Sequence, residues 1–217
     1  MKFAIVNGKK EEAQPKAKGT CLHCDSEMVA KCGKVKVWHW AHKGTQSCDP
    51  WWESETEWHR EWKNQFPNEW QEISHTDSVT GEKHIADVKT PFGLVIEFQH
   101  SPIKDEERIS REHFYDKMIW VVDGFRNELD ANHFRMGLSG PIQKSPLAHQ
   151  VEWWGKSKLL EYWGDSQVKI YLDFGEDVLW RLILFDTQNK MGAVGPLPKQ
   201  TFIEDCKKGI DISVSTL

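Results

Sequence analysis

The chain has 217 residues, of which 28 % are charged and 39 % hydrophobic, a balance typical of one compact domain or of a small module attached to a larger one. No apolar run reaches the roughly 18 residues that span a bilayer, and the N-terminus becomes charged too early for a secretory signal. We therefore expect a cytoplasmic protein with no membrane partner. The net charge of -5 argues against broad coating of DNA, but it permits a nuclease whose metal-binding acids offset basic patches.

Residues 1–48 have the opposite charge balance to the whole chain. They hold nine lysines against four acidic residues, Glu11, Glu12, Asp25 and Glu27. Alternating polar and apolar residues predict short strands at Phe3–Val6 and at Lys34–Trp40. This segment is the better candidate for contact with a polyanion, and a solvated lysine-rich surface is the alternative.

Four of the five cysteines lie within residues 21–48, which in a cytosolic protein favours metal ligation over disulfides. A tetrahedral zinc site needs two local ligand pairs brought together by a hairpin, and residues 27–40 are predicted to form that hairpin. The predicted zinc ligands are Cys21, Cys24, His42 and Cys48. His39 is the substitute if Cys48 stays free, and Cys32 is expected to point away. The alternative is a metal-free cluster of reduced cysteines.

Residues 51–66 predict a helix that Pro67 ends. Its core-facing stripe consists of Trp58, Trp62 and Phe66. About 100° around the helix lies a second stripe, made of Glu55, His59 and Lys63, which we place at the margin of the core. Glu55 and His59 could complete a metal shell, and Lys63 could hold a phosphate or a departing oxygen. The alternative is an ordinary charge ladder at four-residue spacing.

Residues 84–99 predict a β-hairpin with a turn at Thr90-Pro91-Phe92-Gly93. Asp87 lies on the first strand, and Glu97 and Gln99 share one face of the second. Carboxylates in this arrangement suit Mg²⁺, which keeps waters that act on a phosphate. The alternative is a solvated strand face with acids there by chance.

Ser101 and Pro102 predict the start of a second helix, with acidic residues in its first turn, running to about Lys117. One face of this helix carries Arg108, Arg111 and Tyr115. The two arginines fit phosphate contact, and the tyrosine could hydrogen-bond Gln99 or the substrate. A solvated basic face is the alternative. A buried strand, Met118–Val122, follows, so the predicted order is helix, strand, strand, helix, strand.

The remaining residues are less patterned, with strands predicted at 168–174 and 178–185 that either extend the sheet or form a satellite. We therefore predict an α/β protein with a mixed sheet. The predicted divisions are a zinc-binding β module at 1–50, a core at 51–125 and a partly sheet C-terminal extension at 126–217.

These motifs together resemble the competence protein CoiA and its relatives over roughly residues 15–125. The motifs that carry the resemblance are Cys21-x-x-Cys24, His39-Trp-Ala-His42, Glu55-Thr-Glu-Trp-His59-x-x-x-Lys63, Asp87 with Glu97-Phe-Gln99, and Arg111-x-x-x-Tyr115. The resemblance implies a PD-(D/E)XK restriction-endonuclease-like core with an N-terminal zinc-ribbon-like module. It also implies that Asp87 and Glu97 are metal ligands, that His59 is a helix-borne ligand and that Glu55 is a secondary acid.

One position departs from that superfamily. Its usual lysine, two residues after the second acid, is Gln99 here, and a neutral amide supplies no positive charge to the attacking water or the phosphate. Either Lys63 or Lys89 provides that charge, or the enzyme is weak. Gln99 could instead orient a water or hold Tyr115.

The function that we expect is Mg²⁺- or Mn²⁺-dependent hydrolysis of DNA phosphodiester bonds, in DNA uptake, recombination or defence, beside a structural zinc. Nucleic acid, with a recombination or defence protein, would be the partner. The first alternative is a nucleic-acid-binding accessory protein whose core is weakly active or inactive. The second is a zinc-dependent protein-interaction domain.

Overall fold

The computed structural model describes residues 1–44, 48–51, 53, 55–142, 145–154, 159–210 and 212. The chain divides into two compact units, Met1–Lys89 (unit 1) and Thr90–Leu217 (unit 2), and each is described by itself. The predicted division into three parts stays a prediction. Among the described residues, no helix is both long and apolar enough to cross a membrane.

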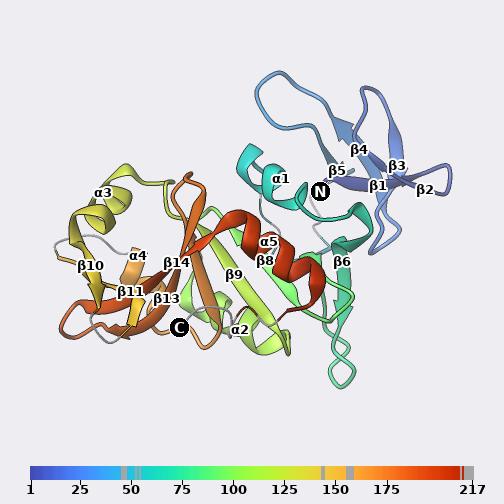
Figure 1. Cartoon of the computed structure of the whole chain (residues 1–217). Helices are drawn as coiled ribbons and strands as arrows, with labels where there is room; N and C mark the ends of the chain where they lie inside the picture. The colour runs from blue at the N-terminus through green and yellow to red at the C-terminus, as the bar shows by residue number, and fades with distance from the viewer. Residues whose placement is uncertain are drawn as a thin grey trace. The chain divides into compact units, whose positions relative to one another are not determined.

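Unit 1 begins with a small antiparallel sheet in the strand order β2-β1-β3-β4-β5 (Figure 1). A helix, a 3₁₀ turn and an antiparallel strand pair follow. Its elements are β1 Phe3–Val6, β2 Lys9–Glu12, β3 Lys18–Thr20, β4 Glu27–Lys31, β5 His39–His42, α1 Glu57–Lys63, η1 Asn68–Trp70, β6 Gln71–Thr76 and β7 Lys83–Lys89. The predicted strand at Phe3–Val6 is confirmed, and Asn7 and Gly8, both at positive φ, turn the chain tightly into β2.

The small sheet has a core of its own, centred on Trp40, which is 1 % exposed. The buried members of this core are Met1, Ala4, Ala13, Cys21, Met28 and Trp40. The predicted hairpin is present, since β4 pairs with β5 in the register Ala30↔Trp40. The strand predicted at Lys34–Trp40 is wrong over its first part. Val35 is 97 % exposed and has no core to pack on, and strand structure starts only at His39.

Unit 2 contains a mixed sheet in the strand order β10-β11-β14-β13-β12-β9-β8. Its elements are β8 Val95–Gln99, α2 Asp105–Phe114, β9 Met118–Asp123, α3 Glu128–Gly137, β10 Leu138–Ile142, β11 Ser145–Glu152, α4 Leu159–Trp163, β12 Lys169–Asp173, β13 Val178–Asp186, β14 Met191–Pro198 and α5 Lys199–Lys208. β9 runs parallel to both β8 and β12, and the other pairs in this unit are antiparallel. The mixed sheet predicted from the sequence is confirmed, and the strands predicted at 168–174 and 178–185 extend it.

Two predicted helices are shorter in the structure. α1 begins at Glu57, because the Thr56 hydroxyl caps it by accepting a hydrogen bond from the His59 amide. It ends at Lys63, and a short turn leads to Pro67. Residues 52 and 54 of the predicted helix lie outside the described part of the chain. α2 begins at Asp105 rather than Pro102 and ends at Phe114, and its N-cap Lys104 makes no side-chain cap. The acidic first turn of α2 is confirmed.

The predicted order of elements is present with one strand added. β6 lies between α1 and β7 and pairs with β7 in the register Ile73↔Ala86. Ile73 is the only aliphatic side chain in Gln71–Thr76, which leaves little alternation to detect. The predicted turn at Thr90 is also present, since the Gly93 amide donates to the Thr90 carbonyl at 3.0 Å and Gly93 has φ +80.

Candidate functional site

The four predicted zinc ligands lie together in unit 1. The ligand atoms of Cys21, Cys24, His42 and Cys48 are all within 4.8 Å of one another. Cys21 follows β3 and Cys24 completes a tight turn after it, while His42 is the last residue of β5. The Cys21 sulfur lies 3.7 Å from that of Cys48, and the Cys24 sulfur lies 3.3 Å from Nε2 of His42. Three thiols and one imidazole form a donor set suited to tetrahedral zinc.

The surroundings of the thiols differ. Burial raises the pKa of Cys24, but the hydroxyl and amide of Ser26 and the ring of His42 outweigh it and lower that pKa to about 6. Burial and the neighbouring thiols raise the pKa of Cys48 to about 12. A divalent cation would deprotonate such thiols on binding. The cluster could therefore hold a structural zinc ion.

The two other candidate residues of this segment lie outside the cluster. His39 makes a 2.8 Å hydrogen bond with the Val37 carbonyl through its Nδ1. Cys32 is half-buried and packs against the core of the small sheet. The set with Cys48, rather than the set with His39, is the one that the structure brings together.

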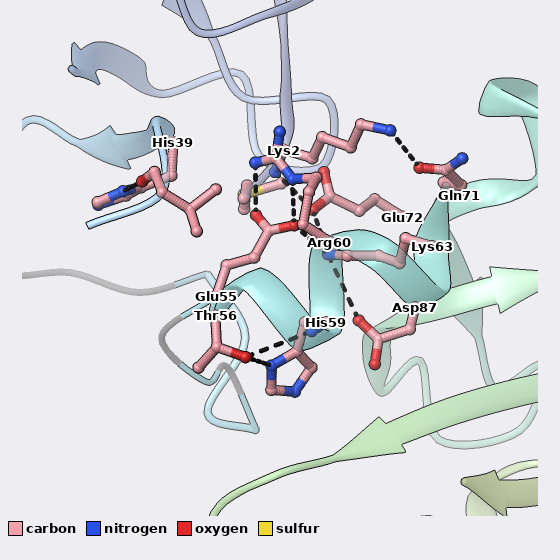
Figure 2. A network of polar contacts seen from close by, with 12 residues as sticks. Lys2, His39, Glu55, Thr56, His59, Arg60, Lys63, Gln71, Glu72 and Asp87 are labelled. Carbon is pink, nitrogen blue, oxygen red and sulfur yellow. Dashed lines mark hydrogen bonds and ion pairs between the residues drawn. The ribbon is translucent and has the colours of Figure 1, made fainter. Parts of the chain in front are cut away.

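A second cluster in unit 1 surrounds Lys63, whose side chain is 5 % exposed (Figure 2). Its Nζ lies 3.0 Å from Glu55, 3.2 Å from Glu72 and 3.7 Å from Asp87. The side chains of Glu55 and Glu72 are 4 % and 5 % exposed, whereas that of Asp87 is 24 % exposed. Asp87 is therefore the carboxylate of this cluster that reaches the surface.

Electrostatics keep Lys63 and Glu72 charged. Burial lowers the pKa of Lys63, but Glu72, Glu55 and Asp87 outweigh it and hold that pKa above its usual value. Burial raises the pKa of Glu72, but Lys63 and the amides of Lys2 and Phe3 outweigh it and bring it down to about 2. Of the predicted stripe, His59 and Lys63 lie on α1 and Glu55 precedes it, and all three side chains are buried rather than at the margin of the core.

Glu72 is a member of this cluster that the sequence patterns did not single out. It sits at φ +50, a left-handed conformation that is uncommon for a residue other than glycine. Its two carboxylate oxygens accept the amides of Lys2 at 2.6 Å and Phe3 at 3.1 Å, which joins β6 to β1. Its partners are far away in the sequence, so no local spacing indicated it.

Two neighbouring side chains on α1 complete this part of unit 1. Arg60 binds Glu55 through two nitrogens, at 2.9 and 3.0 Å. His59, which is 4 % exposed, is oriented by a 2.9 Å hydrogen bond between its Nδ1 and the Thr56 hydroxyl. Its Nε2 lies 3.5 Å from the carboxylate of Glu53.

Comparison with known families bears on the first of these clusters. Residues 6–50 match the family model of the competence protein CoiA, N-terminal domain. The match covers about a fifth of the chain and includes all four members of the cysteine–histidine cluster. No curated protein and no solved structure matches the chain. The matched segment, residues 6–50, is called the CoiA-like module below, and it ends before the residues predicted to carry nuclease chemistry.

Residues beside the cysteine–histidine cluster contact the β6–β7 pair. His23, which lies between Cys21 and Cys24, hydrogen-bonds the Ser74 hydroxyl of β6 through its Nδ1. Next to Cys48, the carboxylate of Asp49 accepts the Ile85 amide at 2.7 Å and lies 2.9 Å from Nδ1 of His84. Within unit 1, the cluster is therefore tied to the strands that carry Glu72 and Asp87.

The predicted residues of unit 2 lie on β8 and α2. Glu97 is 5 % exposed, and its carboxylate accepts from Arg111 at 3.4 Å. Gln99 donates from Nε2 to the Ser101 carbonyl at 2.9 Å. The position of Gln99 on the strand that carries Glu97 agrees with the prediction.

The basic face predicted on the second helix is not solvated. Arg108 and Arg111 are 1 % and 5 % exposed, and Tyr115 is 3 % exposed. Arg108 donates to Glu112 at 3.1 Å and to Asp165 at 2.8 Å. Both arginines therefore hold internal ion pairs, and their contact with phosphate stays a prediction.

Proposed function

We propose that the protein is a divalent-metal-dependent nuclease that hydrolyses DNA phosphodiester bonds in a competence-related process. The observation that carries the proposal is the position of Asp87, a partly exposed carboxylate beside a buried cluster of Lys63, Glu55 and Glu72. Such a carboxylate can bind Mg²⁺ or Mn²⁺ and still leave coordination positions for water.

The proposed ligands are Asp87 and His59, and the sequence adds Glu97. The ion would polarise a phosphate oxygen and lower the pKa of its bound water, which becomes the nucleophile. The assignment of Glu97 to the same ion rests on the sequence, which places it ten residues after Asp87 across a predicted turn.

Two lysines of unit 1 are candidates to supply the positive charge that the neutral Gln99 does not provide. Lys89 has its Nζ 2.8 Å from Nδ1 of His75 on β6. Lys63 has its Nζ 3.7 Å from Asp87 itself, and its surroundings keep it protonated. We therefore assign the fixed positive charge beside the metal ligand to Lys63.

The CoiA-like module supplies structure and charge in this proposal. Its cysteine–histidine cluster would hold zinc and order a sheet with a small core. Its exposed lysines, such as Lys34 and Lys36, would contact the phosphate backbone of DNA.

The test is cleavage of single- and double-stranded DNA by the purified chain with Mg²⁺ or Mn²⁺. Asp87→Ala and Glu97→Ala should each lower the rate at least about 100-fold, because a missing ligand removes the ion that activates the water. Glu61→Gln on α1 and Glu106→Gln on α2, both exposed, are the matched controls and should cleave at the wild-type rate. Cleavage that survives the double variant of Asp87 and Glu97 would exclude this site.

A second candidate function is binding of nucleic acid without cleavage. It is favoured by the ion pair of Glu97 with Arg111 and by the neutral amide at Gln99. This candidate predicts DNA binding that Glu97→Gln leaves unchanged and no cleavage with any divalent ion.

A further inference from the structure

The loop between β4 and β5 exposes an indole ring to solvent. This loop comprises residues 32–38 and belongs to the small sheet of unit 1 (Figure 1). Trp38 is 46 % exposed, whereas Trp40, two residues later, is 1 % exposed. Exposure of a single apolar side chain is common by itself. The surroundings of the Trp38 ring therefore decide what the ring can do.

Hydrogen bonds at both ends of the residue hold Trp38 in place. Its Nε1 donates to the Gly33 carbonyl at 3.1 Å, across the loop. Its own carbonyl accepts from Arg60 of α1 at 2.8 Å, and Arg60 also binds Glu55. A rigid, exposed aromatic ring offers contact area at a low cost in conformational entropy when a ligand stacks on it. Trp38 is therefore suited to a flat ligand.

Exposed lysines accompany this ring along the loop. Lys31 ends β4, and Lys34 and Lys36 lie within the loop, all three of them exposed. Lys34 directly follows Gly33, whose carbonyl the indole contacts. The loop sequence contains no acidic residue that would offset these charges. Lysines beside an aromatic face can bind the phosphates and a base of the same nucleic-acid strand.

A ring in this setting distinguishes a single strand from a duplex. An indole stacks on a base whose face is accessible, and every base has such a face in a single strand. In a duplex the bases are stacked and paired, and exposing one costs free energy. The lysines can contact phosphates of either form, whereas the ring adds affinity for the single strand only.

We propose that the β4–β5 loop binds single-stranded DNA, with an unpaired base stacked on Trp38 and the neighbouring phosphates on Lys34 and Lys36. The inference rests on the proposed function for DNA as the substrate, and it names the single strand as the substrate class.

The contacts of Arg60 connect this loop to the proposed metal ligand within unit 1. Arg60 binds both the Trp38 carbonyl and the carboxylate of Glu55. Glu55 lies 3.0 Å from Nζ of Lys63, which lies 3.7 Å from Asp87 (Figure 2). The binding loop and the carboxylate that would hold Mg²⁺ therefore belong to one connected network of side chains.

Affinity for labelled oligonucleotides tests the proposal, measured by fluorescence anisotropy without Mg²⁺ or Mn²⁺ so that the DNA stays intact. Trp38→Ala should bind a single strand about 5- to 100-fold more weakly than wild type and should bind a duplex equally well. Trp38→Phe keeps an aromatic face and should retain a large part of the single-strand affinity. Trp154→Ala removes a ring that is 45 % exposed on unit 2, and it should bind as wild type does.

The salt dependence separates the role of the ring from that of the lysines. Trp38→Ala removes no charge, so it should keep the wild-type slope of log affinity against log salt. The double variant Lys34→Gln with Lys36→Gln should lower that slope for single strand and duplex alike. A change of slope in Trp38→Ala would mean that the substitution disturbs the phosphate contacts, and it would overturn the stacking role.

A strand without bases provides a measurement that needs no variant. An abasic oligonucleotide keeps the phosphates and lacks the ring's partner, so wild type should bind it about 5- to 100-fold more weakly than the normal strand. Trp38→Ala should bind the two strands alike, because neither offers it a stacked base. Equal affinity of wild type for both strands would overturn the proposal.

The outcomes separate this inference from the proposed function. Cleavage by wild type, with a single-strand affinity that Trp38→Ala leaves unchanged, would overturn the stacking role and leave the nuclease proposal standing. Single-strand binding that depends on Trp38, without cleavage in Mg²⁺ or Mn²⁺, would overturn the nuclease proposal and leave this inference standing. Dimers of wild type that Trp38→Ala dissociates, with unchanged DNA affinity, would make a second copy of the chain the partner of the ring and overturn the inference.

Discussion

Lys63 is a buried cation whose three carboxylate neighbours come from three different segments of unit 1. Such a group stays charged only because its partners offset the cost of burial. Two of those partners, Glu55 and Asp87, belong to patterns that the sequence displays. The third, Glu72, depends on the approach of β1 to β6, which no spacing along the chain indicates. Members of such a cluster that belong to a local pattern can be predicted from the sequence, whereas a member that tertiary contact alone brings in, such as Glu72, cannot.

The depressed pKa of Glu72 predicts a pH dependence of stability. Its ordinary value is 4.5 and its value in the folded chain is about 2, so the unfolded state binds more protons between these limits. The stabilisation due to Glu72 is therefore complete above about pH 4.5 and is lost as the pH falls toward 2. Urea unfolding of Glu72→Gln should show a weaker fall of the free energy of unfolding between pH 5 and pH 3 than wild type does.

Glu69→Gln is the control for this measurement, because Glu69 is exposed and lies three residues earlier in the chain. It should keep the wild-type slope. Loss of metal from the cysteine–histidine cluster at low pH would affect all three proteins equally, so the comparison isolates Glu72. Equal slopes for wild type and Glu72→Gln would contradict the prediction.

Among the elements, buried strands were the easiest to predict. Met118–Val122 is buried throughout and forms β9 together with Asp123, and the apolar strands β12 and β13 were also found. Helix ends were harder, because α2 starts at Asp105 with no side-chain cap although Ser101 and Pro102 offered a cap signal. The β1–β2 hairpin has a local signal in Asn7-Gly8, a pair typical of a tight turn between two strands.

The four residues of the cysteine–histidine cluster lead to a prediction of which variants of the chain retain zinc. Wild type, Cys32→Ser and His39→Ala should each retain zinc, since both substituted residues lie outside the cluster. Cys24→Ser and His42→Ala should lose it, because a closed structural site needs all four ligands. Elemental analysis of the purified chains measures this, and zinc retained by Cys24→Ser would contradict the assignment.

Zinc removal should also loosen a defined set of strands. The cluster joins the ends of β3 and β5, and the core of the small sheet has few large side chains besides Trp40. Chelation should therefore speed amide exchange in β3, β4 and β5. The amides of β9 serve as the internal reference. Unchanged exchange in β3–β5 would mean that the metal does not order the module.

For the molecule as a whole, charge is distributed unevenly along the chain. The net charge is -5, yet residues 1–48 hold nine lysines against four acids. Net charge alone would argue against DNA binding, while the local excess argues for contact through the CoiA-like module. The overall composition therefore indicates a compact chain, and the binding surface has to be found from the distribution of charge.

Lys34 and Lys36 test this surface because both are exposed and precede β5 in a segment that is not strand. Each lysine that contacts a phosphate contributes about one to the slope of log affinity against log salt. The double variant Lys34→Gln with Lys36→Gln should therefore bind DNA more weakly at low salt and lower that slope by up to about two. Lys104→Gln with Lys207→Gln removes the same charge from exposed positions of unit 2 and should keep the wild-type slope. If both double variants changed the slope equally, binding would follow net charge and the module would not be the contact surface.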